Sequence, residues 1–259
     1  MRIDRRPAGR ARACFHEGDT HMKWLLTCMA AVAALVAGPA NAADMPVKAR
    51  PIAEAAYNWT GFYIGGTGGY NNGHLHWVYS SGSVPQQNPF ELSNWNGGVF
   101  GGVQWQMNQI VLGIEANGLW GDITGWSLCT NTAYRCNASV DDLWTVGGRI
   151  GWAWGGGGRI MTFASGGFAS AKVDTLTFLI ATGAVELATT QRHDGWYIGA
   201  GLDFVVVGNW IFGMEYRHYS LESNFHGGVV AASFDRTVKP EWDSLQFRLS
   251  YKFGWGIAR

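Results

Sequence analysis

The sequence has little charge and little proline, and no long segment of it repeats apolar residues at the helical period. Charged residues make up 15% of the 259 residues, and there are 7 Pro. Nucleic-acid-binding chains carry clustered Lys and Arg, and this composition gives no indication of a nucleic-acid partner. The missing 3.6-residue repeat argues against a helical bundle.

Glycine and aromatic residues are abundant instead. The chain has 37 Gly and 14 Trp, and aromatic residues make up 14% of it. Many short strands with glycine in their turns give this profile, and so does a membrane barrel with aromatic girdles. We therefore expect an all-β protein.

The first 56 residues are expected to lie outside the fold. Residues 22–42 contain one basic residue, an apolar stretch and the small-residue site Ala40-Asn41-Ala42, which predicts a signal peptide cleaved after Ala42. We interpret Met22 as the true start, residues 1–21 as a mis-assigned extension, and residues 43–56 as a periplasmic leader.

The mature chain keeps two cysteines, Cys129 and Cys136. In an exported chain such a pair favours a disulfide over a metal site. Closing so short a loop would stabilise the fold by about 2–3 kcal/mol.

The clearest strand is residues 244–253, where polar and apolar side chains alternate. Leu245, Phe247, Leu249, Tyr251 and Phe253 share one face, and the residues between them share the other. About ten residues is the length that a tilted strand needs to cross a bilayer, with lipid outside and a polar lumen inside.

Seven earlier segments carry a similar pattern. The expected strands are residues 57–70, 94–106, 110–120, 142–154, 159–172, 194–206 and 210–221. Tyr57 and Trp59 are expected in an interfacial aromatic belt. Long loops at residues 71–93, 121–141, 173–192 and 222–242 alternate with short turns, which is typical of an outer-membrane barrel. The prediction is an eight-stranded, antiparallel, up-and-down transmembrane β-barrel over residues 57–253, followed by an extension at residues 254–259.

Several motifs resemble the outer-membrane immunogenic protein family, the opacity-like small β-barrel or porin-family proteins of Gram-negative bacteria. They are Y-N-W-T-G-F-Y-I-G at 57–65, G-R-I-M-T-F-A-S-G-G-F-A at 158–169, G-M-E-Y-R at 213–217 and S-Y-K-F at 250–253. The resemblance implies a surface-exposed envelope protein with no catalytic residues. It also implies that Leu249, Tyr251 and Phe253 form the signal for the barrel-assembly machinery. Six residues, 254–259, follow Phe253 in this chain, so Trp255 is the alternative terminal aromatic of that signal.

The inward-facing charges are balanced. Glu115, Asp203 and Glu215 are negative; Arg149, Arg217 and Arg248 are positive; Lys252 lies nearer the periplasmic rim. Because an eight-stranded barrel is just wide enough for its own side chains, we expect these charges to pair and plug the lumen. The alternative is a small porin-type channel in which they act as a selectivity filter.

Two histidine motifs have weaker functional interpretations. His74 and His76 can share one strand face, but no third metal ligand is near in sequence. His218 and Ser220 resemble the pair of small-barrel lipid A deacylases, although Leu221 stands where those enzymes carry asparagine. A lipid A-modifying enzyme is therefore only a remote alternative, and an interfacial position is the main interpretation.

The sequence thus predicts a non-enzymatic envelope protein of the outer membrane whose loops contact the outside. Its expected partners are outer-membrane lipid and lipopolysaccharide, the barrel-assembly machinery and an extracellular surface ligand. No cofactor or metal is expected.

Overall fold

A computed structural model describes residues 56–79, 90–227 and 235–254. The expected N-terminal extension and signal peptide, and almost all of the leader and the C-terminal extension, lie outside these ranges. The described strands are β1 (Gly61–Tyr79), β2 (Phe90–Met107), β3 (Ile110–Trp120), β4 (Ile123–Leu128), β5 (Tyr134–Trp154), β6 (Ile160–Leu179), β7 (Val185–Val207), β8 (Trp210–Leu221), β9 (Asn224–His226) and β10 (Arg236–Phe253).

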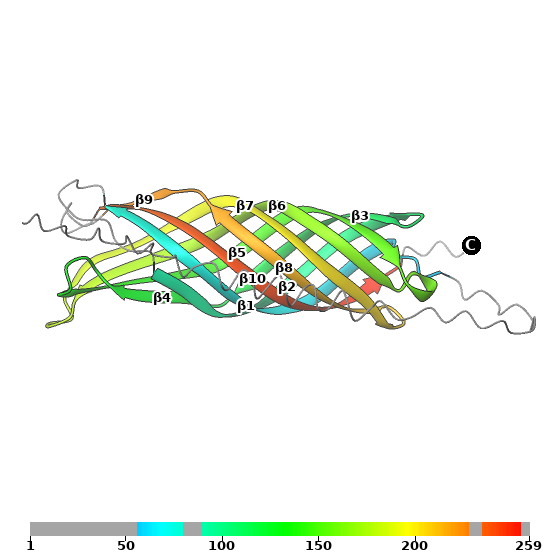
Figure 1. Ribbon diagram of the computed structural model, residues 1–259, viewed down its shortest axis with the longest axis horizontal. Helices are drawn as coiled ribbons and strands as arrows, with labels where there is room; N and C mark the ends of the chain where they lie inside the picture. Colours follow the sequence, from blue (N-terminus) through cyan, green and yellow to red (C-terminus); the bar gives the residue numbers. More distant parts are fainter. Residues whose placement is uncertain (1–55, 80–89, 228–234, 255–259) are drawn as a thin grey trace, which may run out of the picture. The chain divides into compact units, whose positions relative to one another are not determined.

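Eight of these strands close a ring (Figure 1). The order around the ring is β1-β10-β8-β7-β6-β5-β3-β2, and pairing between β1 and β2 completes it. All pairings are antiparallel. The shorter strands β4 and β9 pair with β5 and β10. The predicted eight-stranded antiparallel barrel is confirmed.

Three short connections lie at one end of the barrel, together with the start of β1 and the end of β10. We call this the turn end and the opposite end the loop end. Asn108 (φ 57°) and Gly208 (φ 55°) allow the turns after β2 and β7, and the short 3-10 helix η1 (Gly156–Gly158) joins β5 to β6. A left-handed φ favours Asn and Gly at these positions because they have the smallest steric penalty there.

The expected strand lengths were wrong at the loop end. Residues 71–79, 134–141, 173–179 and 185–192 continue β1, β5, β6 and β7, although they were expected in loops. Residues 236–242 likewise belong to β10, and β4 lies inside the expected loop 121–141. The connection between β6 and β7 therefore shrinks to residues 180–184.

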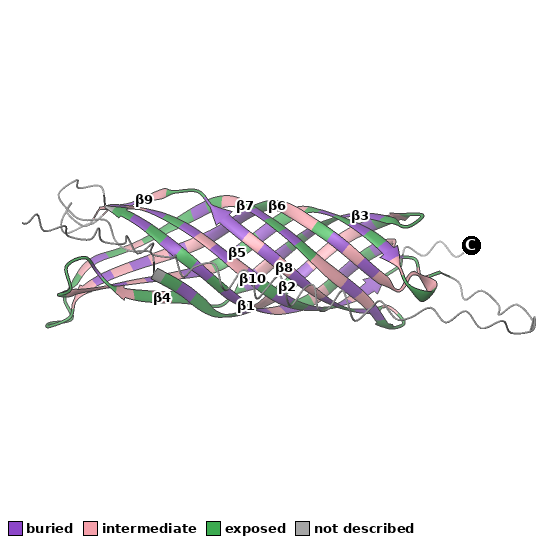
Figure 2. Cartoon of the chain, in the orientation of Figure 1, coloured by how far each residue is buried: buried purple, intermediate pink, exposed green. Residues whose placement is uncertain are grey.

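Towards the turn end, exposed and buried residues alternate along the strands (Figure 2), and the exposed ones include many large apolar side chains, which form an apolar belt on the outer wall. Exposed tryptophans mark the belt: Trp95, Trp105, Trp120, Trp144, Trp152, Trp196 and Trp210. Such a wall suits contact with lipid hydrocarbon rather than water. Among the described residues, no helix is long and apolar enough to cross a membrane.

Beyond the belt, towards the loop end, the polarity of the two faces reverses. On β1, His74 and His76 are exposed on the outside, whereas Leu75 and Trp77 are buried inside. Water replaces lipid around this part of the wall, so the stable arrangement is the apolar-inside one of a soluble barrel. The apolar-outside pattern of a membrane strand ends at this reversal, so these extensions were expected to be loops.

Candidate functional site

The turn end of the lumen is closed by residues 57–59, which turn inward ahead of β1. Trp59 is fully buried and packs with Met161 and Phe163. Its indole Nε1 donates to Gly158 O at 2.9 Å, and its backbone carbonyl accepts from Gln104 Nε2 at 2.8 Å. The expectation that Trp59 would lie in an interfacial belt was therefore wrong, because its ring is buried and its polar atoms are hydrogen-bonded inside the barrel.

Tyr57 accompanies Trp59 in this turn-end plug. The two rings meet edge to face with centroids 5.1 Å apart, and Tyr57 N donates to Gly157 O at 2.7 Å. Lys252 donates to Asn58 O, and its Nζ lies 4.5 Å from the centroid of the Tyr57 ring. The sequence placed Lys252 near this rim, but its role in holding the plug was missed.

The middle of the lumen holds three carboxylates and three guanidinium groups, all buried. They are the six charged residues predicted to face inward: Glu115, Arg149, Asp203, Glu215, Arg217 and Arg248. We call them the lumen charge network. They come from five strands, β3, β5, β7, β8 and β10, so the network ties together most of the ring.

Glu115 is the centre of the network. Its carboxylate lies 3.2 Å from Arg149 Nη1 and 2.9 Å from Arg217 Nη2, and it also pairs with Arg248. Tyr63 donates its hydroxyl hydrogen to Glu115 Oε2 at 2.8 Å. One carboxylate thus meets three cations, which is tolerable only because further carboxylates balance the charge.

The other two carboxylates supply that balance. Arg149 Nη2 lies 2.5 Å from Asp203 Oδ2. Arg217 Nε lies 2.8 Å from Glu215 Oε1, and Arg248 also pairs with Glu215. Buried charges are stable only when paired and hydrogen-bonded, so removing any one member leaves an uncompensated charge.

Aromatic rings fill the space beside the arginines. The guanidinium carbon of Arg149 lies 3.9 Å from the Phe163 ring centroid, and that of Arg248 lies 4.1 Å from the Phe100 centroid. Stacking of this kind favours a cation over a ring face. The network therefore occupies the lumen both electrostatically and sterically.

The loop end is filled by apolar side chains, which we call the loop-end core. It includes Leu75, Leu92, Val173, Val238 and Trp242, all buried. The Trp242 ring stacks on Tyr219, with centroids 4.8 Å apart.

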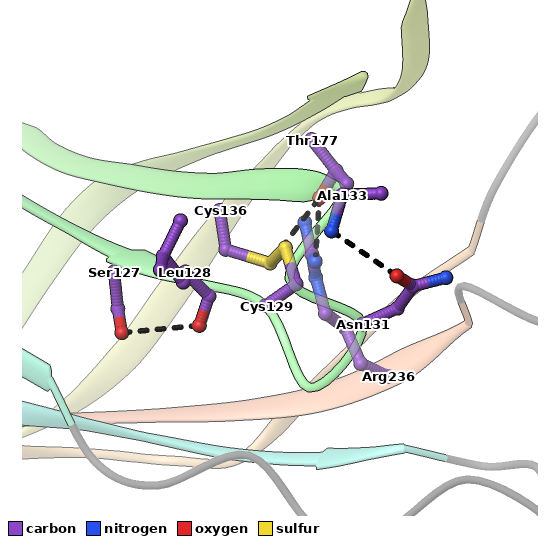
Figure 3. The surroundings of a disulfide bond; sticks show 8 residues. All are labelled: Ser127, Leu128, Cys129, Asn131, Ala133, Cys136, Thr177 and Arg236. Carbon is purple, nitrogen blue, oxygen red and sulfur yellow. Dashed lines mark hydrogen bonds between the residues drawn. A yellow bond between two sulfur atoms is a disulfide. The ribbon is translucent and has the colours of Figure 1, made fainter. Parts of the chain in front are cut away.

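A disulfide lies against this core, joining Cys129, next to β4, to Cys136 in β5 (Figure 3). Cys136 is buried, with its Sγ 3.8 Å from Thr177 Oγ1. Arg236 Nη1 donates to the same hydroxyl at 3.0 Å, and the Arg236 guanidinium lies 3.6 Å from the Trp77 ring centroid. The bridge thus closes the β4–β5 hairpin beside interior side chains of β1, β6 and β10.

The two histidine motifs lie on the outer wall. His74 and His76 are paired in register with Glu241 and Lys239 of β10. Within the described ranges, no group of three or more His, Cys, Asp or Glu side chains is arranged to hold a metal ion.

His218 and Ser220 have separate partners. His218 Nδ1 lies 2.8 Å from Asp243 Oδ1, whereas the Ser220 hydroxyl donates to Glu241 Oε1 at 3.2 Å. A serine nucleophile needs its hydroxyl directed at the base. The observed hydrogen bond directs the Ser220 hydroxyl at a neighbouring strand instead.

The residues predicted to form the assembly signal are on the outward face of β10. Phe253 stacks on Phe62 with centroids 4.6 Å apart, and Tyr251 meets Trp210 edge to face. Leu249 is exposed in the same row. Their role as a signal for the barrel-assembly machinery stays a prediction.

Comparison with known proteins supports the same architecture. The outer membrane protein beta-barrel domain family matches residues 30–253. The 31 kDa outer-membrane immunogenic protein of Brucella melitensis is 32% identical over 240 residues, covering 87% of this chain and 98% of that protein. The 22 kDa outer membrane protein of Rhizobium leguminosarum is 29% identical over 218 residues, covering 82% and 83%.

A solved structure shares the fold. The outer membrane protein OprG from Pseudomonas aeruginosa aligns with a TM-score of 0.50 and 12% identity, covering 78% of this chain and all of that one. The closed eight-stranded ring, its apolar belt and these relatives lead to one assignment: the chain belongs to the outer membrane protein beta-barrel domain family and is an outer-membrane β-barrel protein.

Proposed function

We propose that this protein is a non-conducting envelope protein, in which the barrel serves as an anchor and the loop end faces the outside of the cell. One observation carries the proposal: the lumen is filled at three successive levels. The plug of residues 57–59, the lumen charge network and the loop-end core follow one another from end to end. Ions would have to pass all three, and each is stabilised by its own contacts.

The surface that meets the outside would be the outer wall of the extended strands. Its β4–β5 hairpin exposes Trp126 and Leu128, and the Arg135 guanidinium lies 4.0 Å from the Trp126 ring centroid. Exposed aromatic and arginine side chains are enriched in contact surfaces. Lipopolysaccharide or a ligand on another cell surface is the partner class we propose.

Single-channel conductance of the folded protein in a planar bilayer tests the closed lumen. We expect no measurable conductance at neutral pH. Steady, charge-selective conductance would overturn the proposal and favour a small porin-type channel, with the lumen charges as its filter.

A hairpin exchange tests the contact role separately. Residues 121–141 would be replaced by a short polar turn, and adhesion of cells carrying the protein to a lipopolysaccharide-coated or epithelial surface would be measured. Replacement of residues 180–184 is the matched control. Loss of adhesion in the first variant alone is expected; unchanged adhesion would exclude this hairpin.

A further inference from the structure

The wall of the barrel has a seam at the loop end, between β7 and β9. Strand β8 ends at Leu221, and β9 takes its place beside β10. The last backbone hydrogen bond towards β7 runs from Glu222 N to Asp194 O, at 2.7 Å. Among the described residues, no backbone ladder joins β9 to β7 beyond that point.

Side chains close the seam instead. Asn224 Nδ2 donates to Arg192 O at 2.8 Å, and Thr189 Oγ1 donates to Gly227 O at 3.0 Å. Between these contacts, His193 Nε2 and His226 Nε2 lie 2.9 Å apart, and both residues are fully buried. This histidine pair is the contact that joins the two edges inside the barrel.

The hydrogen-bond partners of the two histidines determine which ring nitrogens carry a hydrogen. His193 Nδ1 lies 2.9 Å from Glu222 O, a pure acceptor, so Nδ1 carries the hydrogen and Nε2 is an acceptor. His226 Nε2 must then donate, and His226 Nδ1 lies 3.2 Å from the Thr175 hydroxyl, which itself donates to Thr189 O at 3.3 Å. This N–H···N hydrogen bond survives a first proton, which His226 Nδ1 can accept, but not a second, because both Nε2 atoms then carry a hydrogen. Protonating His193 Nε2 would place two N–H groups against each other.

The surroundings oppose that protonation. Burial lowers the pKa of His226 to about 4, with further lowering by His193 and by Arg236 of β10, while Asp174 of β6 acts in the opposite direction. Burial also lowers the pKa of His193, against the Glu222 carbonyl and Asp194 of β7. All of these residues lie beyond the apolar belt, where water and not lipid surrounds the barrel.

We propose that the His193–His226 contact is an acid-sensitive latch, which holds β9 against β7 at neutral pH and releases it in acid. Release opens the seam and exposes the loop-end core behind it, including Tyr219 and Val238. Free imidazole takes a proton near pH 6.5, so acid stabilises the open form, in which both rings are hydrated. The inference does not require the proposed surface function, because it concerns only the closure of the wall.

Hydrogen–deuterium exchange of the folded protein in detergent micelles tests the latch. Protection of residues 189–194 and 224–226 would be compared at about pH 7.5 and about pH 4.5, after correction for intrinsic exchange. We expect protection there to fall by at least about tenfold in acid, with β3 unchanged. Equal protection at both pH values would overturn the proposal, whatever the conductance experiment shows.

A double variant, H193Q with H226Q, keeps one donor and one acceptor at the contact but cannot be protonated. It is expected to stay protected at both pH values, and H218Q, on the outer wall, should behave like the native chain. The same acid-induced loss in the double variant would overturn the latch.

If the double glutamine variant does not close the seam even at neutral pH, nitrogen-15 NMR of the imidazoles in the native chain tests whether ring protonation opens the seam. At neutral pH the two rings should be opposite neutral tautomers, and the pH of ring protonation should coincide with that of opening. Opening while both rings remain neutral would exclude the latch.

Discussion

Arg217 Nη2 lies 2.9 Å from Glu115 Oε1, although the two residues are 102 positions apart and belong to β8 and β3. Both are buried, and the pair lies across the lumen from one wall to the other. An ion pair of this kind forms only after the ring has closed, since neither strand is a neighbour of the other in the sheet. The lumen charge network therefore fills the lumen and also depends on the barrel being closed.

Substitution of the central carboxylate should have a large effect. E115Q keeps the shape of the side chain but leaves three arginines facing two carboxylates, so we expect the free energy of unfolding to fall by about 3–5 kcal/mol. Urea unfolding in lipid vesicles measures it. E91Q, on the exposed outer wall, is the matched control and should change stability by less than about 0.5 kcal/mol. Equal effects of the two changes would contradict the network.

The turn-end plug should be stabilising without being the only seal. W59A removes a fully buried ring and its hydrogen bond, which should cost about 3–5 kcal/mol. The W59A variant should nevertheless show no conductance in a planar bilayer, because the lumen charge network and the loop-end core remain. W126A, at an exposed loop-end position, is the control for stability. Ion conduction by W59A would mean that the plug alone closes the barrel.

Two adjacent glycines of β5 should respond in opposite ways. A Cβ on inward Gly147 would lie 2.4 Å from both Tyr197 Oη and Gly166 O, whereas one on outward Gly148 meets nothing nearer than Gly113 O at 3.9 Å. G147A should therefore destabilise the barrel by about 1–3 kcal/mol. G148A should be neutral or slightly stabilising, because alanine restricts the unfolded chain. The change in gel mobility on heating measures the stability of both variants. A G148A variant that is less stable than G147A would contradict the strand register.

Loss of the disulfide should act locally. C129S with C136S frees the β4–β5 hairpin, and we expect about 2 kcal/mol less stability there, since the closed loop is short. Hydrogen exchange should rise in β4 and the start of β5 but not in the turn-end halves of β3 or β8. Faster exchange throughout the ring would show that the bridge supports the whole barrel.

Part of the lumen charge network could be predicted from sequence. Each strand in the belt alternates with period two, so Arg149 and Glu215 had to face inward once the apolar face was assigned to lipid. Which carboxylate each arginine would meet could not be predicted, because partners such as Glu115 and Arg248 come from strands that are distant in the chain.

The strand extensions at the loop end were not predicted from the sequence, and the reason is again physical. Its strands obey the rule of a water-exposed barrel, so Leu75 and His74 exchange the faces that the membrane rule would give them. The same limit hid the histidine pair, because His226 was in the expected loop 222–242 and His193 fell between the expected loop 173–192 and the expected strand 194–206. A change in the parity of apolar residues along β1 was the signal that could have revealed the extension.

By itself, the sequence determined the fold class, the number of ring-closing strands, the outward belt and the inward charges. These follow from local alternation and from the spacing of turns, which depend on neighbouring residues only. The tertiary structure alone decided the inward turn of Trp59, the centre of the charge network at Glu115, the extension of the strands beyond the belt and the histidine pair at the seam. Each of these depends on which distant residues meet when the ring closes, and on whether lipid or water surrounds the wall at that height.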